Sequence, residues 1–246
     1  EVESLDLKLG MNQDITLCLA QRRPWHAIIN SAGVAGVGRS FDEPADYWRN
    51  NAWGAAVLFR EARRLGVRVV HASSALAAYP LHSPYAASKA AAENAALHEN
   101  NAGGDVRVVR IHNVYGPGQP ETFVVPRFLR LAAARESLPL ENGGRTPKDY
   151  VYVGDVADAL LAALDGPGGL LHAASGVWHT PREIGLLAAR LTGQEPRFEE
   201  VEAPWRRADP CPVPELSALA GRWKAEVGLA EGMRRTWLAM QGLRGE

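Results

Sequence analysis

The sequence predicts an α/β protein with a doubly wound parallel sheet, and two patterns support that prediction. Short apolar runs rich in Val and Ile alternate with longer segments rich in Ala and Leu, as strands and crossover helices do. Clusters of Gly and Pro separate these segments and mark the loops. A chain of 246 residues is long enough to bury the core that such a sheet needs.

Each apolar run has the length and composition of a buried strand. The five predicted strands are HAIIN (26–30), VRVVHAS (67–73), VRVVRI (106–111), DYVYV (149–153) and GLLHAA (169–174). The predicted helices occupy residues 48–65, 84–100, 123–135, 156–164 and 181–192, with one more near the C-terminus. PGQPETFVVP and PLENGGRTPKD are predicted loops that flank a helix of a separate lobe, and EAPWRRADPCPVP is a predicted irregular surface segment.

Composition narrows the class of ligand. The formal net charge of -1 predicts neither a nucleic acid nor an anionic membrane as a partner, which leaves small molecules. No apolar run approaches the ~20 residues of a membrane span, and the first residues lack the pattern of a signal peptide. Cys18 and Cys211 are too few for a disulfide framework, which favours the reducing cytoplasm. The 7 histidines show no paired spacing, so we expect no metal site.

Polar residues follow the predicted strands at their carboxyl ends, where open α/β sheets bind ligands. Ser73 and Ser74 end one strand, NSAG (30–33) ends an earlier one, and Tyr85 and Lys89 lie one turn apart in the next helix. An ammonium group one turn away favours the phenolate and lowers a tyrosine pKa from its usual value near ~10. With a serine hydroxyl, such a pair can move a proton on or off a substrate hydroxyl while hydride passes to or from a nicotinamide.

Further segments stand in the order of the motifs of a known family, and they are NSAG, NNAWGAAVLFREARRLGVRVVHASS, RIHNVYGPGQ and KDYVYVGDVADALLAAL. With the serines and Tyr-x-x-x-Lys, they resemble the extended branch of the short-chain dehydrogenase/reductase superfamily, the NAD-dependent epimerase/dehydratase family, which acts mostly on nucleotide sugars. The resemblance implies a Rossmann-like fold with a small C-terminal substrate-binding lobe. It places a partial dinucleotide-binding domain at residues 1–117 and the substrate-binding lobe mainly at 118–246, with 149–176 returning to the Rossmann sheet.

The resemblance also implies roles for individual residues. Tyr85 is the acid/base, Lys89 lowers its pKa and binds the ribose, and Ser74 is the second hydroxyl, with Ser73 as the alternative if the register shifts by one. The residues implied to bind the cofactor are Asp6, Leu7, Asn30, Ala32, Gly33, Asn51, Ser73, Tyr85, Lys89 and His112. Those implied to bind the substrate are Ser74, Asn113, Val125, Arg127 and Lys148.

Three features depart from the family's pattern. No Gly-x-x-Gly-x-x-Gly turn precedes the first residue, so we expect the N-terminal glycine-rich βαβ segment to be absent, and GVAGVG (33–38) is a poor substitute because no helix is predicted directly after it. Ala75 and Leu76 stand where the sugar 4,6-dehydratases carry two acids, which disfavours dehydration. Lys148 replaces an arginine and loses its bidentate fork.

Two functions from different classes follow. The first is an NAD(P)-dependent epimerase or ketoreductase of a nucleotide-activated sugar, with NAD as the expected cofactor, NADP left open, and a homodimer formed through the Tyr85 helix and the Trp48 helix. The second is a catalytically inactive, truncated relative that serves as a binding or interaction module. Cofactor binding by the chain discriminates between them.

Overall fold

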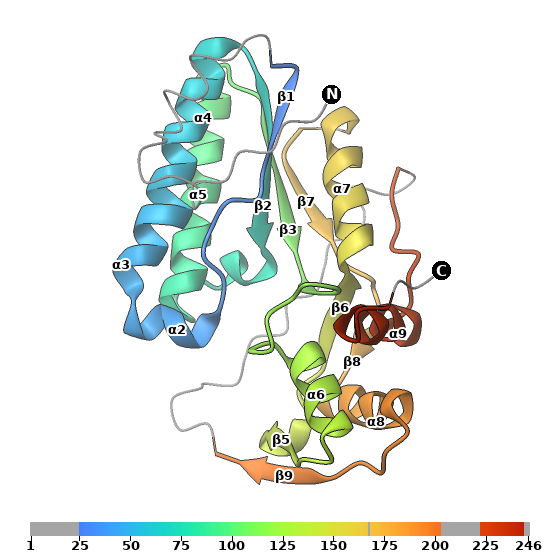
Figure 1. The fold of residues 1–246 in the computed structure, drawn as a ribbon. Coiled ribbons are helices and arrows are strands. Elements are labelled where there is room, and N and C mark those ends of the chain that lie inside the picture. The colour runs from blue at the N-terminus through green and yellow to red at the C-terminus, as the bar shows by residue number, and fades with distance from the viewer. Residues whose placement is uncertain (1–24, 167, 203–221, 244–246) are drawn as a thin grey trace. The chain divides into compact units, whose positions relative to one another are not determined.

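The computed structural model describes residues 25–166, 168–202 and 222–243 (Figure 1). These described residues divide into two compact units, of which the first contains residues 25–110, 160–166 and 168–171. The second contains residues 111–159, 172–202 and 222–243. Asp6 and Leu7, which the resemblance places at the cofactor, lie outside the described residues.

The first unit is built on the predicted α/β sheet. Its strand order is β1-β2-β3-β7, formed by β1 (Ala27–Asn30), β2 (Arg68–Ser74), β3 (Val106–Ile111) and β7 (Leu170–Ala173). β1 and β2 are parallel, with Asn30 opposite His71. Four of the five predicted strands therefore form one sheet, and the predicted fold class is confirmed.

The helices of this unit begin with two short helices, α2 (Val37–Asp42) and α3 (Pro44–Tyr47). They continue with a π-helical turn, η2 (Trp48–Trp53), then α4 (Gly54–Leu65), the 3-10 turn η3 (Ala75–Ala78) and α5 (Pro84–Asn101). The segment GVAGVG was expected not to lead into a helix, and that expectation is wrong, because α2 starts at Val37 behind Gly36, whose φ of 106° suits glycine. α4 ends at Gly66 in the left-handed conformation, which is typical of helix ends.

The core of this unit lies where α4 and α5 pack on the sheet. Leu58 and Phe59 of α4, Ala92 of α5, and Val69 and Val108 of the strands are all buried in one cluster. Small alanines along α5 allow the helix to approach the sheet closely. This packing fixes the start of α5 beside the end of β2.

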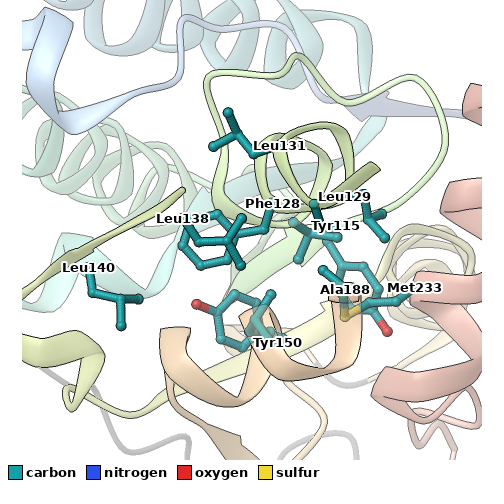
Figure 2. Close-up of a cluster of buried hydrophobic side chains, with 12 residues drawn as sticks. Tyr115, Phe128, Leu129, Leu131, Leu138, Leu140, Tyr150, Ala188 and Met233 are labelled. Atoms are coloured by element: carbon teal, nitrogen blue, oxygen red, sulfur yellow. The ribbon is translucent and has the colours of Figure 1, made fainter. Parts of the chain in front are cut away.

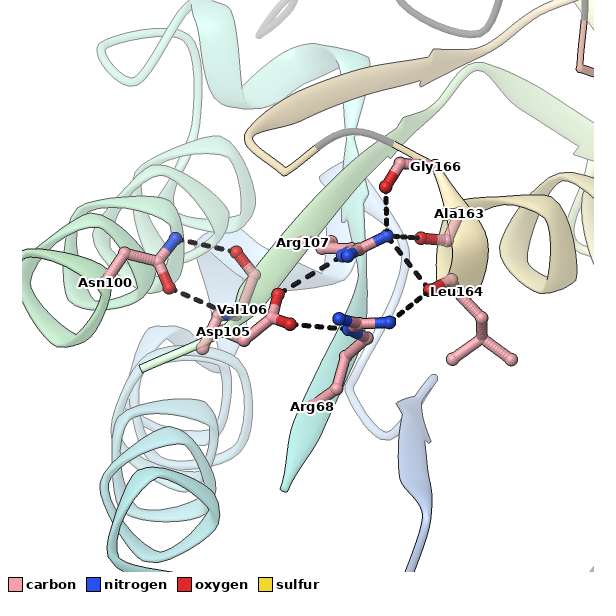
Figure 3. A network of polar contacts seen from close by, with 8 residues as sticks. All are labelled: Arg68, Asn100, Asp105, Val106, Arg107, Ala163, Leu164 and Gly166. Carbon is pink, nitrogen blue, oxygen red and sulfur yellow. Dashed lines mark hydrogen bonds and ion pairs between the residues drawn. The ribbon is translucent and has the colours of Figure 1, made fainter. Parts of the chain in front are cut away.

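The opposite end of the sheet is fastened by a network of arginines (Figure 3). Arg107 donates to the carbonyls of Ala163 and Leu164 at 2.8 and 3.0 Å, and it also contacts the carbonyl of Gly166. Arg68 donates to the same Leu164 carbonyl at 2.7 Å and to Asp105 at 2.5 Å. Ala163 and Leu164 belong to the last turn of the helix α7 (Val153–Asp165), whose final C=O groups have no partner within the helix, and Gly166 follows it directly.

The second unit has a different sheet. β4 (Asn113–Tyr115), β6 (Lys148–Tyr152) and β8 (Trp178–His179) form a three-stranded sheet, and β5 (Leu138–Glu141) pairs in parallel with β9 (Phe198–Val201). Two predictions are corrected here. The strand predicted at 149–153 pairs with β4 and β8 instead of returning to the four-stranded sheet, and the loop predicted at PLENGGRTPKD contains most of β5.

The helices of the second unit match their predictions in position. They are α6 (Val124–Ala133), α7 (Val153–Asp165), which ends in the first unit, α8 (Pro181–Thr192) and α9 (Leu229–Met240), with a 3-10 turn η4 (Asn142–Gly144) before β6. Figure 2 shows their core, in which Tyr115, Phe128 and Met233 are buried together. Gly232 lets α9 approach this core, since a methyl group there would collide with the Tyr115 ring.

None of the helices in the described ranges combines the length and hydrophobicity that crossing a bilayer requires.

Candidate active site

The Tyr-x-x-x-Lys pair lies in the first turns of α5. Ser83 caps this helix by accepting a hydrogen bond from the Ala86 N–H at 3.1 Å, and Pro84 occupies the first helical position, where its missing N–H costs nothing. The start of the helix is thereby fixed, and Tyr85 and Lys89 project from one face. Lys89 is only 7% exposed, and its ammonium group donates to the carbonyl of Ala72 at 3.0 Å.

Burial dominates the electrostatics of the pair. It raises the pKa of Tyr85 above its usual range, although a hydrogen bond with Ser74 lowers it and the nearby Tyr47 raises it further. Burial lowers the pKa of Lys89 to about 8, against the opposing charge of Glu93. The sequence predicts that Lys89 lowers the tyrosine pKa. In the structure the lowering contact comes from Ser74, because the Lys89 ammonium is directed at the main chain of β2.

The loop after β1 is held beside Lys89 by Asn51. Its side chain accepts from the Val34 N–H at 2.8 Å and donates to the Val34 carbonyl at 3.0 Å and to Ser88 at 3.1 Å. Ser88 in turn donates to the Tyr85 carbonyl at 2.8 Å. Asn51 is fully buried and comes from the π-helical turn, a feature often found at functional sites.

Only glycine fits at position 33, because a side chain there would collide with its neighbours. A Cβ atom on Gly33 would lie 2.7 Å from the Asn51 Oδ1 and 3.4 Å from the Lys89 Nζ. A second clamp holds the following residues, since the Tyr47 hydroxyl donates to the carbonyls of Ala35 and Gly36 at 3.0 and 2.8 Å. The loop therefore presents its main chain in a fixed position next to the ammonium group.

Asn30 and His71 form a buried pair between β1 and β2 that the sequence did not predict. The Asn30 amide faces the His71 Nδ1 at 3.0 Å, and its Oδ1 accepts from the Ala32 N–H at 3.2 Å. Burial, and then the charge of Lys89, lowers the pKa of His71 to about 3, so the ring is neutral. Because the amide nitrogen only donates, Nδ1 accepts and the proton sits on Nε2. The pair joins the end of β1 to the middle of β2.

Ser73 and Ser74 have different partners. The Ser73 hydroxyl donates to Glu93 at 2.6 Å, whereas the Ser74 hydroxyl accepts from the Leu76 N–H at 3.2 Å and bonds to Tyr85. This difference favours Ser74 over Ser73 as the second hydroxyl of the site. Glu93 was missed from the sequence, although its position one turn after Lys89 and two turns after Tyr85 was a visible signal.

In the second unit, Asn113 is tied to β6. Its side-chain amide donates to the Asp149 carbonyl at 3.0 Å, next to Lys148. Burial raises the pKa of Asp149, although its carboxylate accepts hydrogen bonds from Ser175 and Gly176 that oppose the rise. Asn113 and Lys148 therefore lie at the start of two paired strands, and their implied contacts with substrate stay predictions.

The other residues predicted in this unit have contrasting exposures. Arg127 is exposed on α6, as a phosphate-binding cation would be, while Val125 is 1% exposed and packs in the core, so only its main chain is within reach of a ligand. His112 lies against His172, with 3.3 Å between the Nε2 and Nδ1 atoms, and both are buried. This contact packs the His112 ring within the protein, and the implied contact of His112 with the cofactor stays a prediction.

A nicotinamide cofactor fits the first unit at the carboxyl end of β1. Ala32 and Gly33 are exposed there, and any side chain on Gly33 would fill the space beside Lys89. The side chains of three residues predicted to bind the cofactor, Asn30, Asn51 and Ser73, form hydrogen bonds to other protein groups. They therefore shape the site through these bonds. The exposed loop and Lys89 can together bind a ribose. The hydroxyls of Ser74 and Tyr85, called the hydroxyl pair below, can exchange a proton with a substrate hydroxyl.

Comparisons with known proteins agree with this geometry. The family model for the NAD dependent epimerase/dehydratase family matches residues 5–172. The chain is similar to the UDP-glucose 4-epimerase of Mycolicibacterium smegmatis, with 32% identity over 250 residues that cover 92% of this chain and 79% of the relative. It is also similar to the UDP-glucose 4-epimerase of Streptomyces lividans, with 30% identity, 84% of this chain and 71% of the relative.

A solved structure shares the fold over nearly the whole chain. It is the UDP-glucose 4-epimerase of Thermus thermophilus in complex with NAD, which superposes with a TM-score of 0.83 and 29% identity over 93% of this chain and 81% of that chain. The family match covers more than half of the sequence and contains Ser74, Tyr85 and Lys89. The expected enzyme class and its dependence on NAD are confirmed at the level of the family. The chain belongs to the NAD dependent epimerase/dehydratase family.

Proposed function

We propose that this chain is an NAD-dependent epimerase that inverts C4 of a UDP-activated sugar. The observation that carries the proposal is the hydrogen bond between Ser74 and Tyr85 beside Lys89, whose pKa of about 8 lies close to physiological pH. Two relatives named UDP-glucose 4-epimerase and a third named UDP-glucuronate 4-epimerase support C4 as the reacting position.

Tyr85 takes the proton of the sugar hydroxyl and returns it at the end of the reaction. Ser74 holds the same substrate oxygen. The Lys89 ammonium donates to the Ala72 carbonyl in the structure, and we propose that it stabilises the phenolate once substrate and cofactor are bound. NAD, when bound, supplies the hydride acceptor and donor. The main chain of Ala32 and Gly33 lines the nicotinamide, and Lys89 holds the ribose. Asn113, Lys148 and Arg127 are proposed to bind the nucleotide diphosphate.

The first experiment incubates the chain with NAD and separately with UDP-glucose, UDP-galactose and UDP-glucuronate, and identifies products by NMR. An epimerase forms the C4 epimer without net production of NADH. A ketoreductase instead leaves these sugars unchanged and consumes NADH or NADPH with a 4-keto sugar. Ala75 and Leu76, in place of two acids, predict that no 4-keto-6-deoxy product appears.

Calorimetric titration with NAD and NADP separates the enzyme from an inactive interaction module. We expect NAD to bind. A folded chain that binds neither nucleotide contradicts the proposed activity and favours the module. The predicted cytoplasmic location stays a prediction, which fractionation of the source cells tests.

We also propose a homodimer formed through η2, α4 and α5. Trp53 and Trp48 are 70% and 46% exposed, and they line an apolar groove with Ala56, Ala91 and Ala95. Exposed tryptophans beside small residues on two adjacent helices are typical of a surface that packs against a second copy. Sedimentation equilibrium of the purified chain is expected to give a dimer, and Trp53→Glu a monomer. A monomeric wild-type chain at micromolar concentration contradicts this proposal.

A further inference from the structure

We infer that Glu93 is a positioning residue of the candidate active site, which joins the end of β2 to α5 and supplies the negative charge that Lys89 faces. The inference rests on the proposed function for its catalytic meaning. It concerns three residues outside the hydroxyl pair, namely Ser73, Glu93 and Arg110, all of which lie in the first unit.

The Glu93 carboxylate joins β2 and β3 to α5 through hydrogen bonds to Ser73 and Arg110. One oxygen accepts from the Ser73 hydroxyl at 2.6 Å, and the other accepts from the Arg110 Nη2 at 2.7 Å. The Arg110 Nε also donates to both oxygens at 3.0 and 3.2 Å, which makes the pair bidentate. The side chains of Arg110 and Glu93 are only 17% and 14% exposed, so solvent screens the pair weakly.

Glu93 and Lys89 bind neighbouring residues of the same strand. Lys89 donates to the carbonyl of Ala72, and one helical turn later Glu93 accepts from the hydroxyl of Ser73. The next residue of the strand is Ser74, the partner of Tyr85. The two contacts therefore fix the position of Ser74 relative to α5. A substitution at Glu93 is expected to shift Ser73, and with it the hydrogen bond between Ser74 and Tyr85.

Among the ionisable groups around Lys89, Glu93 is the one whose charge raises the lysine pKa. His71 faces it from β2 and is neutral, because burial and then the lysine charge lower the histidine pKa to about 3. Tyr85 on the same helix is neutral because burial raises its pKa, and burial likewise raises the pKa of Tyr47 on α3. Arg110 on β3 is a cation beyond Glu93. Burial lowers the Lys89 pKa, and the Glu93 charge opposes that change.

The test measures the protonation of Lys89 directly, without substrate or NAD. The full chain is trace-labelled with acetic anhydride across a pH range of about 6 to 10, and the modification of Lys89 is followed by mass spectrometry, with the exposed Lys224 as internal reference. Wild type is expected to show a midpoint of about 8. Glu93→Gln keeps the shape and the acceptor for Ser73 but removes the charge, so its midpoint is expected to fall by about 1 pH unit. Glu93→Asp keeps the charge and is expected to restore the wild-type midpoint.

Glu99 is a matched control on the same helix. It is paired with Arg63 at 2.5 Å, and its side chain is 12% exposed. Glu99→Gln removes an equivalent charge far from Lys89 and is expected to leave the midpoint unchanged. An unchanged midpoint in folded Glu93→Gln overturns the inference, and so does an equal fall in both variants.

A second variant keeps the inference testable if Glu93→Gln does not fold. Arg110→Gln removes the competing cation and leaves the carboxylate, so the Lys89 midpoint is expected to rise, and an unchanged or lower midpoint overturns the inference. Because labelling needs no turnover, a chain inactive toward UDP-sugars can still show the shift. In an active chain, the basic limb of the pH–rate profile is expected to move in Glu93→Gln and to stay in place in Glu99→Gln.

Discussion

The two ends of the sheet in the first unit both carry buried polar side chains, but they use them differently. At the amino end of β2 and β3, Arg68 and Arg107 bind helix carbonyls and Asp105. Although burial would raise the pKa of Asp105, its hydrogen bonds with the two arginines lower it below the usual range. This end contains charges that stay charged over the physiological range.

At the carboxyl end, by contrast, one buried group has a pKa close to physiological pH. Burial lowers the pKa of Lys89 to about 8, and the Tyr85 hydroxyl shares a hydrogen bond with Ser74. A buried polar network alone therefore does not identify an active site. The distinguishing feature is a group whose charge changes close to working pH next to an exposed loop.

The largest expected effect is that of Tyr85→Phe. Removing the hydroxyl removes the proton carrier at the carboxyl end, so the epimerisation rate is expected to fall by about 10²–10⁴-fold. Calorimetry is expected to show NAD binding close to wild type, because the ring remains. Substantial activity in the phenylalanine variant would contradict the assignment of this end as the reacting one.

Arg107→Gln tests the amino end. Arg107 is 7% exposed and donates to several helix carbonyls, so its loss is expected to reduce the free energy of unfolding by about 3 kcal/mol, measured in urea. The kcat of the folded fraction is expected to stay at the wild-type value. Arg64→Gln, which removes an exposed ion pair with Glu61, is the control and is expected to cost about 0.5 kcal/mol or less. A fall in kcat with unchanged stability would erase the contrast between the two ends.

Lys89→Met tests how much stability the buried lysine costs at the carboxyl end. The lysine pKa is lower in the folded chain, about 8, than the ordinary 10.5, so the unfolded chain binds more protons between these values and stability rises with pH across that window. The methionine variant is expected to be about 2 kcal/mol more stable near pH 7 and to lack this rise. Thermal melting at about pH 7 and about pH 9.5 measures both effects, and a parallel pH dependence in the two proteins would refute the lowered pKa.

Gly33→Ala has the smallest expected effect. The added methyl group would press on Asn51 at 2.7 Å, so the loop must move, at a cost of about 1 kcal/mol in stability together with weaker NAD binding. Gly168→Ala is the control, since no atom lies within 4 Å of its added Cβ. Unchanged NAD affinity in Gly33→Ala would show that the loop does not border the cofactor.

The positions of the site residues that are local in sequence could be predicted. Tyr85 and Lys89 are four residues apart on one helix, and the serines end a strand with a clear apolar pattern, so periodicity was sufficient to place them. Their roles came from the family resemblance and stay predictions. The contacts of Glu93 with Ser73 and Arg110 could not be predicted, because they depend on the register between a helix and two strands.

The errors in the fold prediction also concern partners distant in sequence. β5 contains Pro139, which is unfavourable within a strand, and it pairs with β9, which lies about 60 residues later. The local sequence of either segment therefore does not predict a strand. The apolar pattern of β6 predicted a strand correctly, but it contains no information about which sheet the strand joins. α2 was missed because its start depends on the positive φ of Gly36.

The most direct test of the central claim uses UDP-glucose with deuterium at C4. The chain is incubated with NAD and this substrate, and the products are analysed by NMR and mass spectrometry. We predict UDP-galactose that retains the deuterium at C4, formed by wild type and about 10²–10⁴-fold more slowly by Tyr85→Phe. An epimer that has exchanged its deuterium with water would contradict the account, and so would a folded wild-type chain that binds NAD yet forms no C4 epimer from UDP-glucose, UDP-galactose or UDP-glucuronate.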